Sequence, residues 1–586
     1  MSDAFSLKIS PTTKARPRYA QIFLRSGHFF ACMLTMTNNP TWPVAAASRI
    51  RIKITNDSYC RLFYNHSTGS INLIPLTADD ASAITTAPHA EIYDHSQTSA
   101  NVEQDPLYQS YLSQSKDGNK QIVDSFHPDD VIGANLSLEY NLHNPNTFHG
   151  MQSYASAQIN IYCYPKNNRK KQREPNHKSY IVDSKCCEDF SDVRALVQSI
   201  RTLSGLQNNT NNALPQRFLV ILNPYSGGNG PKSKSGATFV YETMVKPMLE
   251  QAGVEHDKLA TNHGGHAKER MELRKSTSDD DDNHVEEGGD CTDSELKDIS
   301  EYDAIIAMGG DGILFEIFQG IHARSTDEAQ ILCKLKFGIV PCGTCNGLAK
   351  SILHWSDNAE YTPMESVFQI CKGHTSRLDL ASYQLAKTEK TYTSFLSFSW
   401  GLIADCDLES ECLRWLGALR TDIWAVYRGI LFPKKYRARF SYLPLSNKTN
   451  NGSASTKIDL PKLNEPLSKD WVTIEDDFSV FWVCNTTHAS YNVFTCPMSK
   501  MNDGVFHVLI VRSSVSRLRL LQMLLKLETG GHIECEGLEI ISCLAYRLEP
   551  LSDNTYNDLD GELIEGGTIQ ARCFNTAHFF AGKVDR

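Results

Sequence analysis

The sequence predicts an α/β plus β protein of three domains, because the period of its hydrophobic residues changes twice along the chain. Residues 1–206 alternate between apolar and polar side chains, as the strands of an antiparallel fold do. Residues 215–374 combine short apolar runs with helical patterns, which indicates a parallel sheet covered by helices. From residue 375 to residue 582 the period of two returns. A chain of 586 residues is also too long for a single hydrophobic core.

The composition is that of a folded protein that does not bind nucleic acid. The net charge is −10, whereas the neutralisation of phosphates needs a basic surface. The first residues lack the apolar core of a signal peptide, and no run approaches the roughly 18 apolar residues of a transmembrane helix. The 17 cysteines show no framework spacing, and we expect them to be reduced. These features predict a cytoplasmic protein.

The first domain is predicted to be a small β-rich domain that ends in an amphipathic helix. Runs such as SRIRIKIT and AQINIYCY are separated by polar loops. Several strands followed by one helix resemble the order of pleckstrin-homology-like barrels, and a β extension specific to one family explains the pattern equally well. The apolar residues at helical spacing are Phe190, Val193, Leu196, Val197, Ile200 and Leu203.

The second domain repeats a strand, a turn and a helix. An acidic stretch of low hydropathy, residues 275–298, interrupts this pattern and is predicted to be a disordered insertion. Ligands of such parallel sheets bind at the carboxyl ends of the strands. The expected strands are RFLVILNP, DKLATN, YDAIIAMG and KLKFGIVP, and the expected helices are ATFVYETMVKPMLEQAG, HAKERMELRKS, ILFEIFQGIHA and GLAKSIL.

The third domain is predicted to be an antiparallel sandwich that two helices interrupt. The helices are expected in LESECLRWLGALRTDIWAVYRGIL and SVSRLRLLQMLLKL. The expected strands are SRLDLASYQL, TYTSFLSFSW, YRARFSYLP, VTIEDDFSVFWV, VFHVLIV, CLAYRLEP and TIQARCF.

Three glycine-containing turns follow three successive strands of the second domain. They are residues 223–230 (NPYSGGNG), 309–312 (GGDG) and 343–346 (GTCN). A strand, a glycine turn and a helix present backbone N–H groups to phosphate, so three such turns indicate a nucleotide site. None of them contains the Gly-Lys-Ser/Thr of a Walker A motif. Asp311, between glycines, can approach a ligand, although an aspartate there is also typical of a turn or helix cap.

The motifs NPYSGGNG, TNHGGHA, MGGDGILFEIFQG and VPCGTCNGLA together resemble the catalytic domain shared by diacylglycerol, ceramide and sphingosine kinases. SWGLIADCDLESECLRWLGALR and LDGELIEGGTIQA are most similar to sphingosine kinases. The resemblance spans about residues 215–582. It implies a phosphofructokinase-like nucleotide domain joined to a β-sandwich with a lipid pocket, and transfer of the γ-phosphate of ATP to the primary hydroxyl of a sphingoid base.

The resemblance assigns roles to residues of this chain. Asp311 matches the general base, which orients the hydroxyl and accepts its proton. Mg²⁺ is implied as a cation carried by ATP, with no metal ligands from the protein. The residues that match nucleotide-binding positions are Asn223, Thr261, Gly310, Gly312, Thr344, Arg414, Arg420, Asp560 and Glu562.

Asp407 matches the acidic residue that holds the sphingoid amine, and it is also placed to cap a helix expected to begin at Leu408. The lipid substrate implies contact with a membrane surface without a spanning segment. The helix that contains Leu520, Leu521, Met523 and Leu524 either lies in that interface or packs on the core. The positions that match the lining of the lipid pocket are Leu402, Ile403, Leu524, Leu527 and His532.

The third turn departs from the family pattern. Relatives usually have Gly-Ser-Gly-Asn where this chain has Gly343-Thr-Cys-Asn346. Cys345 in place of glycine would cause strain of about 1–2 kcal/mol if the position requires a positive φ. The Cys342–Cys345 spacing alone resembles a redox pair or half a zinc site, but the family match of the surrounding residues accounts for the loop.

Several alternatives remain open at this stage. A ceramide kinase also has an N-terminal pleckstrin-homology-like domain, but its substrate lacks the free amine that Asp407 would pair with. A diacylglycerol kinase is disfavoured because no zinc-finger spacing precedes the catalytic region. A pseudokinase or lipid sensor is an alternative because of Cys345. Protein partners, chain-length preference and oligomeric state are not indicated by the sequence.

Overall fold

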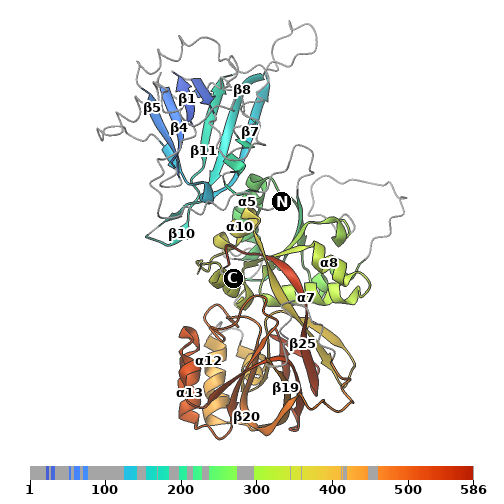
Figure 1. Cartoon of the computed structure of the whole chain (residues 1–586). Coiled ribbons are helices and arrows are strands. Elements are labelled where there is room, and N and C mark those ends of the chain that lie inside the picture. Colours follow the sequence, from blue (N-terminus) through green and yellow to red (C-terminus); the bar gives the residue numbers. More distant parts are fainter. Residues whose placement is uncertain are drawn as a thin grey trace. The chain divides into compact units, whose positions relative to one another are not determined.

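The computed structural model divides into two compact units, residues 1–212 and 213–586 (Figure 1). The described residues are 21–25, 28–32, 52–53, 59–65, 70–76, 124–140, 154–167, 169–183, 194, 197–198, 200–202 and 204–206 in the first unit, and 216–227, 236–273, 296–343, 345–357, 359–410, 412–413, 419–445 and 460–584 in the second.

The first unit contains two antiparallel sheets, with the strand orders β2-β1-β4-β5-β6 and β3-β11-β8-β7. In β8, residues from Gln158 to Cys163 alternate between partly buried and buried, so one face of this sheet packs on a core. Of the predicted terminal helix, Val197 and Ile200 are helical and buried, and its other predicted apolar residues lie outside the described residues. The strands are β1 (Gln21–Arg25), β2 (His28–Cys32), β3 (Ile52–Lys53), β4 (Tyr59–Asn65), β5 (Ser70–Leu76), β6 (Asp124–Phe126), β7 (Val131–Tyr140), β8 (Tyr154–Cys163), β9 (Lys166–Asn167), β10 (Gln172–Arg173) and β11 (Lys178–Asp183).

The second unit begins with a parallel sheet in the order β13-β12-β14-β15. Its central strand, β14, is buried at every position, because helices cover both faces of a parallel sheet. The strands are β12 (Arg217–Leu222), β13 (Glu255–Ala260), β14 (Ala304–Gly309) and β15 (Lys336–Pro341). The helices are α4 (Ala237–Val240), the π-helical turn η4 (Tyr241–Val245), α5 (Lys246–Ala252), α6 (His266–Glu272), α7 (Asp311–Ala323), α8 (Glu328–Lys334), α9 (Gly347–Trp355) and α10 (Pro363–Lys372).

The rest of the second unit is built from antiparallel strands. Strand β20 pairs with β18, β19 and β21, and the buried aromatic residues Phe440, Phe481 and Tyr546 pack together in the core. The strands are β16 (Thr375–Leu385), β17 (Thr391–Ser394), β18 (Ser397–Gly401), β19 (Tyr436–Pro444), β20 (Val472–Cys484), β21 (Phe506–Arg512), β22 (Leu538–Pro550), β23 (Asn557–Leu559), β24 (Glu562–Ile564) and β25 (Ile569–Phe580). The helices are α11 (Leu402–Glu409), α12 (Leu419–Val426), its π-helical continuation η7 (Tyr427–Leu431) and α13 (Arg517–Leu525).

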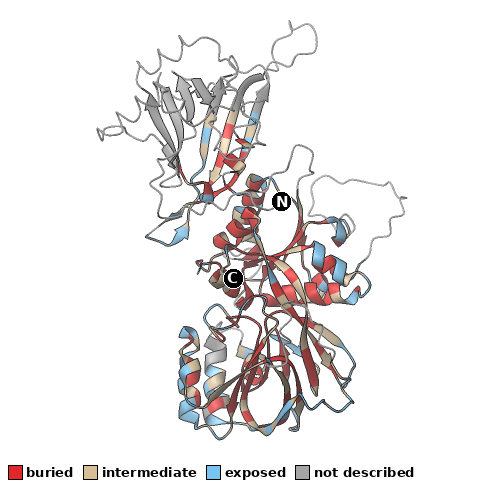
Figure 2. Cartoon of the chain, viewed as in Figure 1, coloured by how far each residue is buried: buried red, intermediate tan, exposed pale blue. Residues whose placement is uncertain are grey.

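One long strand, β25, joins the parallel and antiparallel parts of the second unit. Strand β25 pairs with β16 along its length, and its last residues pair in parallel with β15, Phe337 opposite Phe579. The result is one sheet of 14 strands that runs through both parts (Figure 1). The buried core is likewise continuous from one part to the other (Figure 2).

The structure changes the boundary of one predicted helix. We expected a helix from Leu408 onward, but α11 begins at Leu402, directly after Gly401. Gly401 has a φ of 80°, so the chain turns sharply there from strand β18 into the helix. Asp407 therefore lies inside the helix, and the prediction that it caps the helix N-terminus was wrong.

Candidate active site

The glycine turns after β12, β14 and β15 pack directly against one another. The backbone N–H groups of Cys342 and Gly343 both donate to the carbonyl oxygen of Gly309, at 3.0 Å. A Cβ at Gly343 would lie 2.8 Å from the Cα of Gly310, and a Cβ at Gly309 would lie 3.3 Å from the Oγ of Ser226. The missing side chains thus let three backbones form one surface, which is the kind of cradle that a phosphate chain fits.

Asp311 is the first residue of α7 and lies at this surface, almost entirely buried. Its Oδ2 accepts a hydrogen bond from the N–H of Gly347 at 2.7 Å, and its Oδ1 accepts one from Leu348 at 3.3 Å. Burial raises its pKa to about 7, although these two hydrogen bonds act in the opposite direction. Asp311 is thus held at the N-terminus of α9 and titrates near neutrality.

The TNHGGHA turn is fixed by a second carboxylate of α7. Glu316 accepts hydrogen bonds from the N–H groups of Gly265 at 2.8 Å and Ala267 at 3.1 Å. The turn is therefore tied to the same helix that begins with Asp311. Thr261, at the end of β13, is buried, and its hydroxyl donates to the carbonyl oxygen of Leu222 at 3.4 Å.

Four further residues match nucleotide-binding positions, and the structure describes the side chain of only one of them. Asn223 is described, and its Oδ1 accepts a hydrogen bond from the N–H of Tyr225 at 3.0 Å, which shapes the first turn. Thr344 and Arg414 lie outside the described residues, and so does the side chain of Arg420, whose backbone belongs to α12.

The Asp-Gly-Glu motif forms a tight hairpin between β23 and β24. Asp560 and Gly561 both have positive φ, 56° and 87°, as a two-residue turn between antiparallel strands requires. Burial raises the pKa of Asp560 to about 6, against the effect of its hydrogen bonds. The donors to its carboxylate are Ser394 Oγ (2.7 Å) and the N–H groups of Phe395 (3.1 Å), Leu396 (3.0 Å) and Ser397 (2.9 Å).

Glu562, the first residue of β24, brings this hairpin to the GGDG turn. Its Oε1 lies 2.5 Å from the position that a Cβ on Gly312 would occupy. Glu562 is exposed, whereas Asp560 is buried. The two carboxylates of the motif therefore have different surroundings: Asp560 holds the loop between β17 and β18, and Glu562 lies on the glycine turn.

Asp407 lies next to the same hairpin. Its Oδ2 would be 3.7 Å from a Cβ on Gly561, so the last turn of α11 approaches the tip of the Asp-Gly-Glu turn. Asp558, on β23, is also close enough that Asp407 raises its pKa. The predicted residues Asp311, Asp407, Asp560 and Glu562 are thus linked through one hairpin and the turn that it contacts.

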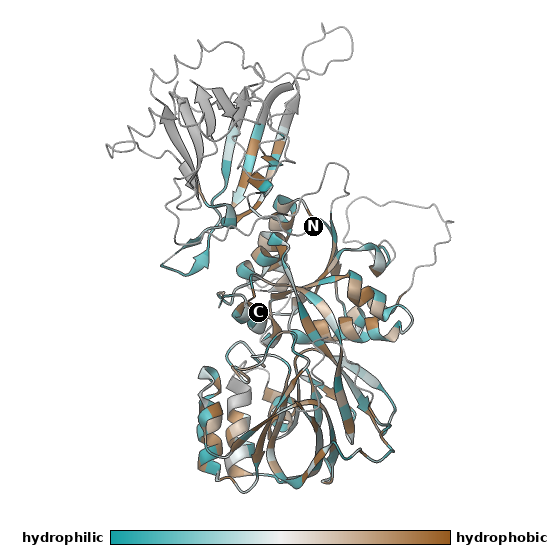
Figure 3. Cartoon of the chain, viewed as in Figure 1, coloured by the Kyte–Doolittle hydropathy of each residue, from teal (hydrophilic) through white to brown (hydrophobic). Residues whose placement is uncertain are grey.

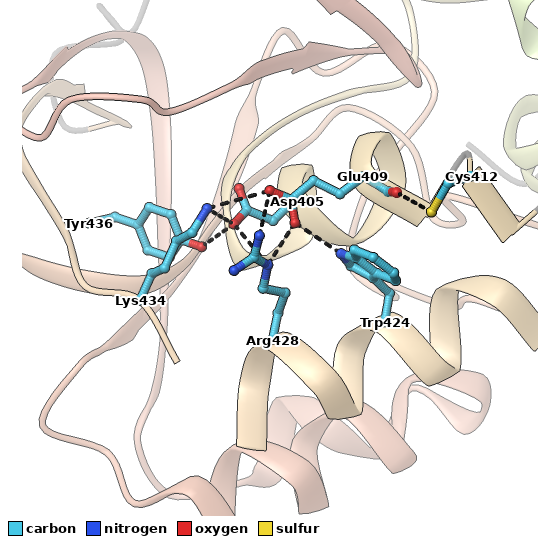
Figure 4. Close-up of polar contacts among 7 residues, drawn as sticks. All are labelled: Asp405, Glu409, Cys412, Trp424, Arg428, Lys434 and Tyr436. Atoms are coloured by element: carbon cyan, nitrogen blue, oxygen red, sulfur yellow. Dashed lines mark hydrogen bonds and ion pairs between the residues drawn. The ribbon is translucent and has the colours of Figure 1, made fainter. Parts of the chain in front are cut away.

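A network of polar contacts (Figure 4) anchors α11 through Asp405 and Glu409, which lie on the face of the helix opposite Asp407. Asp405, which is fully buried, accepts hydrogen bonds from the hydroxyl of Tyr436 at 2.7 Å and from Lys434 Nζ at 2.9 Å. Glu409 accepts two from Arg428, at 2.6 and 2.8 Å, and one from Trp424 Nε1 at 3.0 Å. Burial would raise the pKa of Glu409, but the hydrogen bonds from Arg428 and Trp424 outweigh it, and the pKa is lowered.

Four of the predicted lipid-pocket residues belong to one apolar cluster between α11, α13 and the sheet. Leu402 is buried, and Ile403, Leu524 and Leu527 are partly buried against the cluster. His532 is also buried, and its Nε2 lies 2.8 Å from the carbonyl oxygen of Thr495. The buried members of the cluster are Leu402, Cys406, Val480, Trp482, Cys484, Cys496, Leu509, Val511, Leu520 and Met523.

The two cysteines of the third turn have different environments. Cys342 is buried, and burial raises the pKa of its thiol to about 12. Cys345 is exposed and is not among the described non-glycine residues with positive φ. The strain that a glycine-specific conformation would cause at this position is therefore not present.

The described residues show neither a metal-binding cluster nor a membrane-spanning helix. No group of three or more His, Cys, Asp or Glu residues within them could hold a metal ion. None of the helices that the structure describes is long and apolar enough to cross a bilayer.

Two features of this region were missed in the sequence. Asp558 precedes the recognised motif by two residues, and only the pairing of β23 with β18 shows that it lies opposite Ser399. The pairing of Glu409 with Arg428 was missed because 19 residues separate them.

Residues 217–383 match the family of the diacylglycerol kinase catalytic domain. Sphingosine kinase 1 of Mus musculus is 31% identical over 375 residues, which cover 61% of this chain and 89% of the relative. Sphingosine kinase 1 of Arabidopsis thaliana is 30% identical over 371 residues, which cover 61% of this chain and 69% of the relative. A solved structure of a diacylglycerol kinase from Bacillus anthracis str. Sterne matches at 16% identity and a TM-score of 0.41, covering 63% of this chain and 97% of that chain.

Proposed function

The chain belongs to the sphingosine kinase family, and we propose that it transfers the γ-phosphate of ATP to the primary hydroxyl of a sphingoid base. One observation carries this proposal. Asp311, a buried carboxyl with a pKa of about 7, lies where the glycine turns meet and where the Asp-Gly-Glu hairpin comes close.

Asp311 would act as the general base. A carboxyl that titrates near neutrality is partly ionised at the working pH and can accept the proton of the substrate hydroxyl. Its hydrogen bonds to Gly347 and Leu348 fix the carboxylate in one orientation, so the hydroxyl is also positioned. In a loose phosphoryl-transfer transition state, positioning supplies most of the acceleration.

The nucleotide would lie on the glycine turns. The close backbone contact between Gly310 and Gly343 supports this, because a Cβ at Gly343 would meet the backbone of Gly310 and push the two turns apart. ATP would bring Mg²⁺, which neutralises charge on the phosphates during transfer. Glu562 is the residue of the hairpin through which we expect contact with the nucleotide, whereas Asp560 would position that hairpin. The other proposed nucleotide-binding residues are Asn223, Thr261, Gly312, Thr344, Arg414 and Arg420.

The lipid would bind beside α11. Asp407 would pair with the ammonium group, since a carboxylate next to the Asp-Gly-Glu hairpin can hold the head group close to the phosphates. The hydrocarbon chain would enter the apolar cluster that contains Leu402, Ile403, Leu524 and Leu527, bordered by His532. A free amine distinguishes this substrate from ceramide, the substrate of the second candidate function.

We also propose that the enzyme is cytoplasmic and reaches its substrate by peripheral contact with a membrane. Leu520 and Met523 are buried in the core, so the part of the helix that we first considered for the interface faces inward. Other apolar side chains on α12, η7 and α13 are exposed, and hydrophobic residues recur along these helices (Figures 2 and 3). They are Ile423, Val426, Tyr427, Leu431, Phe432, Leu518 and Leu525.

We propose a separate role for each of the three domains. Residues 215–374 would bind the nucleotide, residues 375–582 would bind the lipid, and residues 1–206 would form a pleckstrin-homology-like domain. The two antiparallel sheets of the first unit, followed by buried helical residues, support this last assignment.

The decisive experiment is an assay with radiolabelled ATP that compares sphingosine, ceramide and diacylglycerol as acceptors. We expect phosphate transfer to sphingosine, and loss of transfer in the Asp311→Asn variant. Transfer to ceramide alone would establish the ceramide kinase instead, and ATP binding without transfer to any acceptor would establish a pseudokinase.

A further inference from the structure

Asp558 is a buried carboxylate that the proposed mechanism does not use. It lies on β23, opposite Ser399 of β18, and only 5% of it is exposed. Its Oδ2 accepts a hydrogen bond from the hydroxyl of Ser399 at 2.6 Å. Its Oδ1 is buried and has no hydrogen-bond partner among the described residues. An unmatched carboxylate oxygen in the interior is costly, so a group that completes it is to be expected.

The surroundings of Asp558 are acidic on two sides. Asp407 approaches from α11, and Asp560 is two positions further along the same chain segment. On its other flanks, β18 presents the neutral hydroxyl of Ser399 and β24 places Leu563 opposite Asp558. Burial and then Asp407 raise the pKa of Asp558, whereas the hydrogen bond from Ser399 acts against this. Without a cation beside it, Asp558 therefore favours the protonated form, because two nearby carboxylates do not both ionise readily.

We propose that Asp558 is the second carboxylate of the head-group site, and that with Asp407 it encloses the ammonium group of a sphingoid base. This inference rests on the proposed function and extends it by one specificity-determining residue. An ammonium group carries three N–H donors, more than a single carboxylate at one side of it can accept. The orphaned Oδ1 of Asp558 supplies the further acceptor.

The carboxylates of Asp407 and Asp558 would also explain why the enzyme discriminates against neutral lipids. A cationic amine stabilises the ionised form of both carboxylates, so its binding releases the proton of Asp558 to the solvent. The amide of ceramide and the ester groups of diacylglycerol carry no charge, so they do not drive this ionisation and leave Asp558 protonated. These lipids therefore bind without the charge-assisted hydrogen bonds that a sphingoid amine would make to both carboxylates.

The first test is steady-state kinetics of the Asp558→Asn variant with sphingosine, beside wild type. We expect KM to rise by about tenfold or more, because a hydrogen bond to a charged group is lost, while kcat changes little. The matched control is Glu565→Gln, which removes a carboxylate near the end of the same hairpin, where it contacts Lys390 and Tyr392. An unchanged KM in Asp558→Asn would overturn the inference, whereas inactivity of the wild type on sphingosine would instead overturn the proposed function.

The second test separates recognition from a structural role. The inhibition constant of 1-deoxysphingosine, which keeps the ammonium group but has no primary hydroxyl to phosphorylate, is measured over a series of pH values up to neutrality, where its amine stays protonated. For wild type and Glu565→Gln we expect tighter inhibition as the pH rises toward the raised pKa of Asp558, since binding releases a proton. Asp558→Asn should show no such rise, and a slope equal to that of wild type would contradict the inference.

A third variant keeps the test decisive if Asp558→Asn does not fold. Ser399→Ala retains the carboxylate but removes a hydrogen bond that favours its ionised form. The plot of the inhibition constant against pH should then be shifted to higher pH than the plot for wild type. A curve that does not move would overturn the inference.

Discussion

Asp311 shows how one side chain is tuned by opposing effects. The N-terminus of α9 donates two hydrogen bonds to its carboxylate, which favours the ionised form. Burial favours the neutral form more strongly, and the pKa rises to about 7. The raised pKa also affects stability: the favourable contribution of the protonated form is complete below the ordinary pKa near 3.8 and is lost as the pH rises through about 7.

The first prediction concerns the pH dependence of catalysis. A base must be ionised, so kcat/KM for sphingosine should increase as the pH rises toward about 7 and then level off. Asp311→Asn should lower kcat by about 10²–10⁴-fold and lose this ionisation from the profile. Assays of both proteins over a pH series check this, and a variant that keeps the wild-type profile would assign the ionisation to another group.

The second prediction concerns Cys345. It is exposed beside the proposed phosphate site, so N-ethylmaleimide should modify it, and MgATP should protect it. Cys333, exposed on α8, is the control that should react with or without MgATP. Cys342 should stay unmodified in the folded protein, because it is buried with a raised pKa. Mass spectrometry of the labelled peptides measures all three sites, and equal protection of Cys333 would mean that MgATP acts indirectly.

Among the helices and strands, α11 lies between a network of polar contacts and the Asp-Gly-Glu hairpin. On one side, Asp405 and Glu409 bind Arg428, Lys434 and Tyr436 (Figure 4). On the other side, Asp407 approaches the turn of the Asp-Gly-Glu hairpin. The network therefore fixes the helix from which the proposed amine-binding carboxylate projects, as a supporting shell around a site does.

The third prediction tests this anchoring. Arg428→Gln should lower the free energy of unfolding by about 1–3 kcal/mol, because it removes hydrogen bonds to the largely buried Glu409. KM for sphingosine should rise as α11 loses its fixed position. The control Arg437→Gln breaks an exposed pair with Glu475 and should cost less than about 1 kcal/mol. Urea unfolding and steady-state kinetics measure both variants, and equal effects would show that the network has no special role.

The fourth prediction compares two glycines of neighbouring turns. In Gly343→Ala the new Cβ would meet the backbone of Gly310 at 2.8 Å, so the turns must separate and the protein should be destabilised. In Gly312→Ala it would meet only Oε1 of Glu562, the end of a flexible and exposed side chain, at 2.5 Å. We expect near-normal stability with weaker ATP binding for Gly312→Ala. Thermal unfolding and ATP titration distinguish the two, and a large loss of stability in Gly312→Ala would contradict this assignment.

In the whole molecule, residues 213–586 form one compact unit, although the chain changes within it from a parallel α/β pattern to an antiparallel β pattern. The reason is β25, which pairs with strands of the antiparallel part and then, through its last residues, with β15 of the parallel sheet. A strand shared by both parts couples their stability, because its loss would remove a pairing partner from each part.

The fifth prediction follows from this arrangement. A protein that begins at residue 213 should fold in one cooperative transition and retain a kcat for sphingosine close to that of the full chain. Calorimetry and the radiolabelled-ATP assay measure the two properties. Two separate transitions would show that the shared strand does not couple the parts, and loss of activity would assign residues 1–212 a part in catalysis.

The motifs and hydrophobic periods of the sequence were sufficient to identify the family of this chain and most elements of its second unit, because both are local properties. The periodic runs predicted strands such as RFLVIL and helices such as GLAKSIL close to where they lie. The start of α11 was misplaced because the turn at Gly401 depends on its backbone conformation, which one glycine does not reveal.

The packing of the folded chain brings carboxylates that are distant in the sequence into one region, and the sequence did not reveal this. The pKa of Asp311 depends on its burial, and the neighbours of Asp558 come from segments about 150 residues away in the chain. The structure also separated the roles of Asp560, which binds the loop between β17 and β18, and Glu562, which lies on Gly312. Desolvation and charge proximity are properties of packing in three dimensions, so no local pattern of residues could have specified them.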